Sequence, residues 1–319
     1  MLAAALASAF GLYGEISLAG AEFPARPIRM IVPFPLGGGT DIVARIISVS
    51  ASDKLGQPII VDNRPGAGGI GGTDIAAKST PDGYTIVTVI ITHATNPALY
   101  KRLPFDSLKD FSSIGLLTKN PQLLAVNANL PVKSVADLIA LARSSKESLI
   151  FASGGNGTPS HFAAELLRSA ANINLLHVPY KGSAPAILDL IAGRVTLNFS
   201  SLPSLLNFVK GGRLHALAIT GLSRSQLLPD TPTIAESGFP GFEVSAWQGL
   251  LAPAGTPASV INALNSATRD ALAIPAVREK LVAQGYEPAH TDPHAFNTYL
   301  RSEMAKWGKV VRDNGIRAD

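Results

Sequence analysis

The sequence predicts an α/β protein made of two lobes with a ligand cleft between them. Short β-branched runs alternate with helical patterns from Pro27 to about Lys210. Glycine-rich turns follow several of these runs, and the chain after Pro229 holds mostly helices. Alternating strands and helices form parallel sheets with helices on both faces, so these three observations indicate the α/β class.

The alternation begins with a strand predicted at 28–34 and a helix predicted at 41–55, where apolar residues recur at helical spacing. Further strands are expected at 59–61, 85–92, 123–126, 149–152, 175–178, 195–199 and 214–219. Helices are expected between them at about 70–78, 135–144, 160–171, 184–192 and 204–210. This order predicts parallel pairing within the sheets.

The C-terminal third has a different pattern. Helices are predicted at 257–273, 275–284 and about 293–314, with one short strand near 244–251. Helices with a single strand to cover are expected to pack back onto the first sheet. The first lobe is therefore predicted to be discontinuous, residues 22–120 plus 230–319, and the second to span 121–229. Two crossover segments join them, and a cleft lies between.

Composition excludes several classes of protein. With 319 residues, of which 46% are hydrophobic and 16% charged, the chain can bury two medium-sized cores and is not disordered. The net charge of +4 is dispersed, which argues against a nucleic-acid partner. The absence of cysteine excludes disulfides, thiol nucleophiles and Cys-ligated metals.

The N-terminus resembles a secretory signal peptide. Residues 1–21 are small and apolar apart from Glu15, and they end in Ala19-Gly20-Ala21, an A-x-A-type cleavage site. No lysine or arginine precedes the apolar stretch, which leaves the true start of the signal open. A buried first helix is the alternative, but its glycines would each weaken it by about 1 kcal/mol. We expect a mature, soluble, monomeric protein that begins near Glu22, since no later run reaches the roughly 18 apolar residues of a membrane span.

The first strand-to-helix junction has the composition of an anion site. Three glycines, Gly37, Gly38 and Gly39, let the backbone approach a ligand closely, and Thr40 is a good N-cap for the next helix. Exposed amides and the positive end of the helix dipole favour a bound anion at such a turn.

The second lobe repeats this pattern at residues 153–161. Thr158 can cap the helix, and Pro159 then takes the first helical position, which suits its ring. His161, just inside the helix, is more typical of a hydrogen-bonding loop partner than of a base. Two more junctions, 178–183 and 198–201, follow, and ligands of open α/β sheets bind where such loops gather. Any single loop could be merely an efficient turn, but glycine-rich loops in both lobes favour a ligand site.

No pattern supports an enzyme, a cofactor or a metal. Residues 66–71 match G-x-G-x-x-G, but 62–65 separate them from the preceding strand, whereas the dinucleotide fingerprint needs a direct turn from strand to helix. The sequence has no G-x-S-x-G elbow, H-E-x-x-H pair or Walker A lysine. Its six histidines show no pair at metal-ligand spacing.

Seven motifs run in order from about residue 24 to the C-terminus: PIRMIVPF at 27–34, GGGTD at 37–41, NRPGAGG at 63–69, PDGYT at 81–85, NGT at 156–158, HVPYKG at 177–182 and LAPAGTP at 251–257. With them the chain resembles the substrate-binding receptors of tripartite tricarboxylate transporters, also called the Bug family of periplasmic proteins. The resemblance implies a type II periplasmic-binding-protein fold that holds a carboxylate through main-chain groups and waters. It also implies a periplasmic location and membrane permease subunits as partners.

The junctions and the resemblance together predict which residues contact the ligand. We expect these to be Phe34, Gly38, Gly39, Thr40, Thr92, His93, Ser153, Asn156, Gly157, Thr158, His161, Tyr180, Ser200 and Trp247.

Two departures from the family concern the ligand. The chain has the apolar stretch 89–91 where the family usually has small polar residues, and it has Ser200 where many relatives carry an aspartate that would suit an ammonium group. A buried ammonium without a carboxylate partner is costly. We therefore expect a small carboxylate without an amine, its apolar or aromatic body resting near Ile91 and Trp247.

Two other functions stay open at this stage. A sensory receptor that presents its ligand-bound form to a membrane kinase would use the same closed lobes, so the sequence does not separate transport from sensing. An enzyme on a related two-lobe fold would need a nucleophile or an acid–base pair in the cleft, and the missing motifs argue against it.

Overall fold

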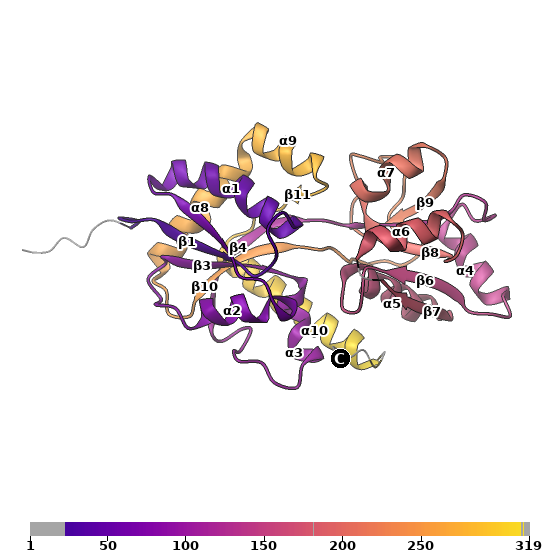
Figure 1. Cartoon of the computed structure of the whole chain (residues 1–319), viewed down its shortest axis with the longest axis horizontal. Helices are drawn as coiled ribbons and strands as arrows, with labels where there is room; N and C mark the ends of the chain where they lie inside the picture. Colours follow the sequence, from indigo (N-terminus) through magenta and orange to yellow (C-terminus); the bar gives the residue numbers. More distant parts are fainter. Residues whose placement is uncertain (1–22, 181, 314, 316–319) are drawn as a thin grey trace, which may run out of the picture.

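The computed structural model describes residues 23–180, 182–313 and 315, which form two α/β units, each built around one sheet (Figure 1). The predicted signal peptide, residues 1–21, lies outside the described residues. The first unit contains strands from both ends of the described chain, and the second contains strands from its middle. The predicted α/β class is confirmed.

The first unit begins with β1 (Ile28–Val32), α1 (Gly39–Leu55), β2 (Ile59–Asn63), the 3₁₀ turn η1 (Ala67–Gly69), α2 (Ile70–Ala77), β3 (Thr85–Ile90), α3 (Ile91–Leu99) and β4 (Phe111–Lys119). The second unit comprises β5 (Gln122–Asn127), α4 (Val135–Ser144), β6 (Leu149–Ser153), α5 (Pro159–Ala171), β7 (Leu175–Pro179), α6 (Ser183–Ile191), β8 (Leu197–Ser201), α7 (Leu202–Lys210) and β9 (Leu214–Ile219). The chain then returns to the first unit with β10 (Gln248–Pro253), α8 (Ala258–Ala273), α9 (Pro275–Ala283), β11 (Glu287–Pro288) and α10 (Pro293–Asp313).

Both sheets are mixed, and the prediction of parallel sheets is wrong. Their strand orders are β11-β4-β10-β3-β1-β2 and β7-β6-β8-β5-β9. Gln248, at the start of β10, pairs antiparallel with Ile90, at the end of β3. Gln122, at the start of β5, pairs in the same way with Ser201, at the end of β8. Both strands run against their neighbours because the chain arrives from the other unit, at the end of the sheet where the parallel strands stop.

The elements β4, β11 and α3 differ from those predicted, and no predicted strand covers the two residues of β11. Strand β4 is absent from the predicted strands because serines and Gly115 interrupt its apolar run. Helix α3 begins at Ile91, inside the predicted strand 85–92. The β-branched Ile91 and Thr92 favour a strand locally, but α3 packs along α10 and this tertiary contact decides its conformation.

Helices cover both faces of both sheets. In the first unit, α1, α8 and α9 pack on one face and α2, α3 and α10 on the other (Figure 1). In the second unit, α6 and α7 cover one face and α4 and α5 the other. One apolar cluster runs through both units, since the rings of Phe162 in α5 and Trp307 in α10 have centroids 4.8 Å apart. The units therefore share an apolar contact along α5 and α10.

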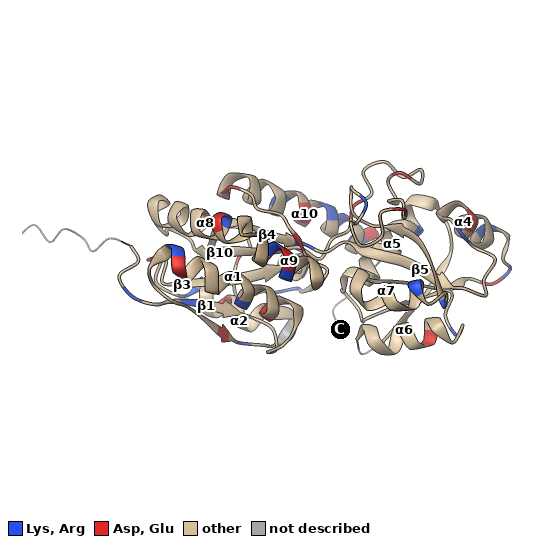
Figure 2. Cartoon of the chain, turned by 90° about the horizontal axis from the view of Figure 1, so that it is seen from above, with Lys and Arg blue, Asp and Glu red and all other residues tan. Residues whose placement is uncertain are grey.

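Charged residues are spread over both units. Figure 2 shows Lys and Arg interspersed with Asp and Glu in both units. Among the described residues, no helix is long and apolar enough to cross a membrane.

Candidate ligand site between the two units

Helix N-termini gather where the two units face each other. Helices α1 and α3 of the first unit, and α5, α6 and α7 of the second, each begin shortly after a strand ends. The first-turn amides of a helix have no acceptor within it and carry partial positive charge. A Cβ at Gly157, before α5, would lie 3.6 Å from Leu99 Cδ1 at the end of α3, and one at Gly285, after α9, would strike the ring of Pro203 in the first turn of α7, so the first unit meets the second where α5 and α7 begin. This arrangement suits a small anion.

The first junction loop enters α1 through Gly38, which is the N-cap residue. Thr40, predicted as the cap, is instead the second residue of the helix and is 7% exposed. No side chain caps α1, and the carboxylate of Asp41 in its first turn instead accepts the amide of Gly37, in the loop before the helix, at 2.9 Å.

Asp41 is itself paired. Arg45 Nε and Asn63 Nδ2 each donate to its carboxylate at 3.0 Å. Burial acts to raise the pKa of Asp41, but the hydrogen bonds from Arg45, Gly37 and Asn63 outweigh burial, and the pKa is lowered. Asp41 therefore stays ionised and bound to Arg45, and does not offer a free carboxylate to a ligand.

The second junction loop is held by its own side chains. Thr158 caps α5 by accepting the His161 amide at 3.4 Å, and Pro159 takes the first helical position, so both features of the predicted helix start are confirmed. Gly154 N donates to Ser160 Oγ at 3.0 Å, and Gly155 N donates to Ser153 Oγ at 3.1 Å. These bonds fix the loop while leaving Asn156 exposed at its tip.

A pair of stacked imidazole rings lies beneath this loop. The rings of His161 and His177 have centroids 4.1 Å apart. His161 Nδ1 accepts the amide of Gly157 at 3.1 Å, and His177 Nε2 lies 2.6 Å from Ser153 Oγ. Burial, with a contribution from His177, lowers the pKa of His161 to about 3, and burial lowers that of His177 to about 4. Both rings are neutral near pH 7 and support the loop from below.

The other two predicted residues of the second unit are also paired. Tyr180 donates its hydroxyl to Asp189 Oδ2 at 2.6 Å, and this bond raises the pKa of Tyr180. Ser200 is 2% exposed, and its hydroxyl donates to Asn198 Oδ1 at 2.7 Å. The structure places both near the ends of their strands, with their hydroxyl groups turned toward partners within the second unit.

Two predicted residues have buried side chains. His93 is 3% exposed, and its ring stacks on Phe105 while Nε2 bonds the carbonyl of Ser107 at 2.9 Å. Burial lowers the pKa of His93 to about 4. Trp247 is fully buried, and its Nε1 donates to Glu303 Oε2 at 2.9 Å. His93 nevertheless lines a small hollow that Phe34 of the first loop also borders, whereas Trp247 does not line it.

The apolar contacts of the first unit lie elsewhere than expected. Ile91 is fully buried, whereas Ile90 is only partly buried. Ile90 lines a small hollow together with Phe34 and Thr92. The helix that starts at Ile91 turns that side chain inward, so Val89 and Ile90 are the apolar residues of this stretch that line the hollow beside the first loop.

Two further residues belong beside the first loop. Gln248 is 3% exposed, and its Nε2 lies 3.4 Å from the carbonyl of Gly39, while its Oε1 has no partner within the described chain. Tyr286 lies against Gly39, where a Cβ would strike its hydroxyl, and burial raises the pKa of Tyr286. The sequence reasoning missed both because Gln248 starts a strand and Tyr286 follows a helix, and neither stands at a strand-to-helix junction.

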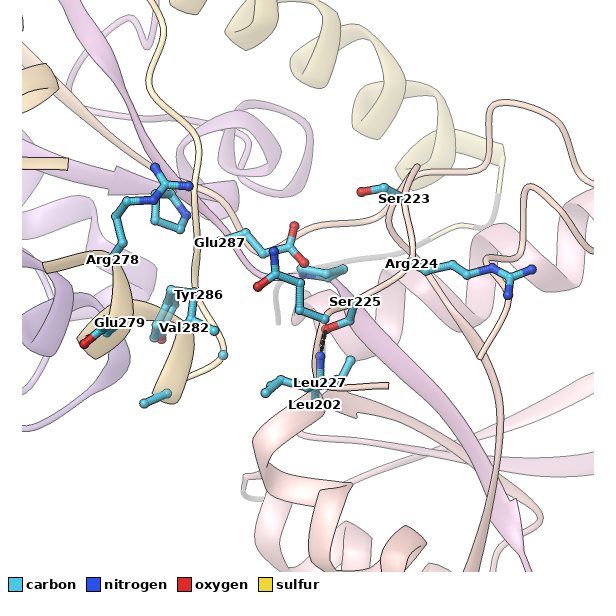
Figure 3. Close-up of a pocket in the computed structure, with 15 residues that line it drawn as sticks. Leu202, Ser223, Arg224, Ser225, Leu227, Arg278, Glu279, Val282, Tyr286 and Glu287 are labelled. Carbon is cyan, nitrogen blue, oxygen red and sulfur yellow. Dashed lines mark hydrogen bonds between the residues drawn. The ribbon is translucent and has the colours of Figure 1, made fainter. Parts of the chain in front are cut away.

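A crevice of ≈ 590 Å³ lies at one end of the boundary between the units (Figure 3). Arg278, Val282 and Tyr286 line one wall, and the segment 223–227 forms the other. Glu287 lies between the two walls in Figure 3, and burial raises its pKa. None of the predicted ligand residues lines this crevice, but Tyr286, which lies against Gly39, and Leu202, the first residue of α7, place it next to two of the junction loops.

Two α/β units joined by two crossovers, with opposed helix N-termini, form the architecture of a two-lobe solute-binding protein. Within the described part of the chain, no three His, Asp or Glu side chains are grouped as metal ligands would be.

Comparison with known proteins identifies the family. Residues 43–316 match the family described as "Tripartite tricarboxylate transporter family receptor", and the chain belongs to this family. Protein BugT of Bordetella pertussis is 39% identical over 302 residues, which cover 92% of this chain and 91% of BugT. Receptors of the family are periplasmic binding proteins that bind small carboxylates and work with transporter permeases.

Two solved structures hold dicarboxylates. Rpa4515 of R. palustris, "with adipate", is 36% identical with a TM-score of 0.77, and the match covers 93% of this chain and 99% of Rpa4515. MatC of Rhodopseudomonas palustris, "with bound malate", is 33% identical with a TM-score of 0.73, and the match covers 91% of this chain and all of MatC, 100%. The predicted family and the periplasmic-binding-protein fold are confirmed.

Proposed function

We propose that this chain is exported to the periplasm and captures a small carboxylate without an amine for the permease of a tripartite tricarboxylate-type transporter. The solute binds between two lobes, residues 22–120 with 230–319 and residues 121–229. The lobes move about the two crossover segments, which connect β4 to β5 and β9 to β10.

The observation that carries the proposal is that helices of both units begin near the boundary between the units, since Gly39 of α1 lies against Tyr286 and the neighbouring Gly285 lies against Pro203 of α7. Helix α1 contributes the first-turn amides of Gly39 and Thr40, while α5 and α6 start side by side, since a Cβ at Gly154 would lie 3.2 Å from Ser183 Oγ. Each helix end offers about 0.3–1 kcal/mol to a nearby negative charge, and more when partly buried. Several such ends together favour a carboxylate.

The preference against an amine rests on the charges that the site offers. The carboxylate of Asp41 is paired with Arg45 and Asn63, that of Asp189 with Tyr180 and Arg194, and the Ser200 hydroxyl donates to Asn198. A solute ammonium group would lose its hydration without gaining a free carboxylate, at a cost of several kcal/mol. The adipate of Rpa4515 and the malate of MatC are both acids without an amine.

Calorimetry and thermal unfolding test the proposal. We expect adipate, malate, succinate or a benzoate-type acid to bind more tightly than aspartate or glutamate. A solute at 100 times its Kd should stabilise the protein by about 2.7 kcal/mol. Tighter binding of an amino acid than of every amine-free acid would refute the preference.

A matched pair of variants tests the position of Ser200. Ser200→Asp should weaken binding of the preferred acid about tenfold or more, because a second negative charge would face it in a region of low dielectric. Ser200→Asn has a similar size without the charge and should bind the acid nearly as the unaltered protein does. An equal loss of affinity in both variants would show that the shape of the side chain at position 200, and not its charge, controls binding.

A further inference from the structure

The bond between Gly157 and His161 defines the state of one ring. The amide of Gly157 donates to His161 Nδ1 at 3.1 Å. A backbone amide can only donate, so Nδ1 must be the unprotonated acceptor and the ring proton must sit on Nε2. That side of the ring faces Glu165, whose Oε1 lies 3.9 Å from Nε2. His161 is thus a neutral ring with one nitrogen committed to the loop.

The neighbouring ring supports the start of the same loop. His177 Nε2 lies 2.6 Å from Ser153 Oγ, which in turn accepts the amide of Gly155 at 3.1 Å. Phe151 stacks on His177 with ring centroids 4.5 Å apart. One stacked pair of imidazoles therefore ties down both ends of the segment 153–157.

Segment 153–157 needs these hydrogen bonds because of its backbone conformation. Gly155 and Gly157 have φ angles of +128° and +73°, in the left-handed region that glycine tolerates and that no regular hydrogen-bond ladder maintains. Gly157 also faces Leu99 of the first unit. A displacement of Gly157 would therefore change both the start of α5 and the contact between the units.

We propose that His161 is a positioning residue of the solute site, whose neutral ring holds Gly157 so that the second junction loop and the N-terminus of α5 keep the geometry that receives the carboxylate. The claim that this loop receives the carboxylate rests on the proposed function. The claim that His161 holds Gly157 in place is independent of it.

The surroundings keep this acceptor available. Burial lowers the pKa of His161 to about 3, and the charged groups on its own helix, Glu165 and Arg168, pair with each other. Helix α10, which packs against α5, contributes Glu303 and Lys306, which also form an ion pair. Strand β7 contributes the neutral His177. The acceptor nitrogen therefore stays unprotonated over the ordinary range of pH.

Two substitutions separate the acceptor from the ring. His161→Asn retains an oxygen near the position of Nδ1 but removes the stacked ring, and His161→Phe retains the ring but removes the acceptor. We expect the exchange protection of the Gly157 amide, measured by NMR at pH 7, to fall at least about tenfold in His161→Phe and much less in His161→Asn. A role in packing alone predicts the reverse order. His161→Leu replaces His161→Phe if the larger ring prevents folding.

Calorimetry with adipate and malate completes the test. The Kd of the acid that binds should rise at least fivefold in His161→Phe and stay near the unaltered value in His161→Asn. Equal Gly157 protection in the two variants would overturn the inference, as would loss of protection without loss of affinity. Failure of every acid to bind the unaltered protein would overturn the proposed function instead, and amide exchange would still decide whether His161 fixes the loop.

Discussion

Lowering the pH should destabilise this protein through His93. The ring is 3% exposed, stacks on Phe105 and has a pKa lowered to about 4 by burial. In the unfolded chain a histidine has a pKa of about 6.5. Because the folded-state pKa is the lower one, the stabilising contribution is complete above pH 6.5 and is lost as the pH falls from 6.5 toward 4. At pH 5 the loss should reach about 2 kcal/mol, since each pH unit corresponds to 1.36 kcal/mol.

Urea unfolding at pH 7.5 and pH 5 measures this loss, and His93→Gln isolates it. Glutamine keeps an amide donor for the Ser107 carbonyl, which His93 Nε2 contacts at 2.9 Å, but does not titrate. The unaltered protein should therefore lose about 2 kcal/mol more than His93→Gln between the two pH values. The same substitution at His215, which is only half-buried and bonds the Ala128 carbonyl, serves as the control. Equal pH dependence of the unaltered protein and His93→Gln would refute the reasoning.

Three other outcomes can be measured directly. Thr158→Ala should cost about 1 kcal/mol of stability through the lost cap and should weaken carboxylate binding by more than that, so unchanged calorimetric affinity in a folded variant would count against the second loop. Glu303→Leu should cost at least about 2 kcal/mol, because Trp247 and Trp307 donate to one Glu303 oxygen at 2.9 and 2.8 Å and both indoles would lose their acceptor; unchanged urea unfolding would contradict this. N-terminal sequencing of exported protein should find a start near Glu22, and material that began at Met1 would disprove the predicted cleavage.

The start of α5 shows what the sequence determines by itself. A threonine followed by a proline satisfies the first amides of a helix within a few residues, so Thr158 and Pro159 predict the helix start without knowledge of the fold. The glycine-rich loops and their order along the chain are equally local, and they suffice to predict the α/β class and the family. Such motifs identify a family because the backbone turns of its fold require particular residues at particular positions.

The partners of the polar side chains were decided only by the tertiary structure. Asp41 accepts a hydrogen bond from Asn63, and Trp247 donates to Glu303, which lies 56 residues further along the chain. His93 stands beside a junction in the sequence, but because α3 begins at Ile91, its ring turns into the core. A buried polar group must find a partner, and which partner it finds depends on the segments that pack around it. A local pattern therefore predicts where a loop forms, whereas the packing of distant segments determines which of its side chains face the ligand.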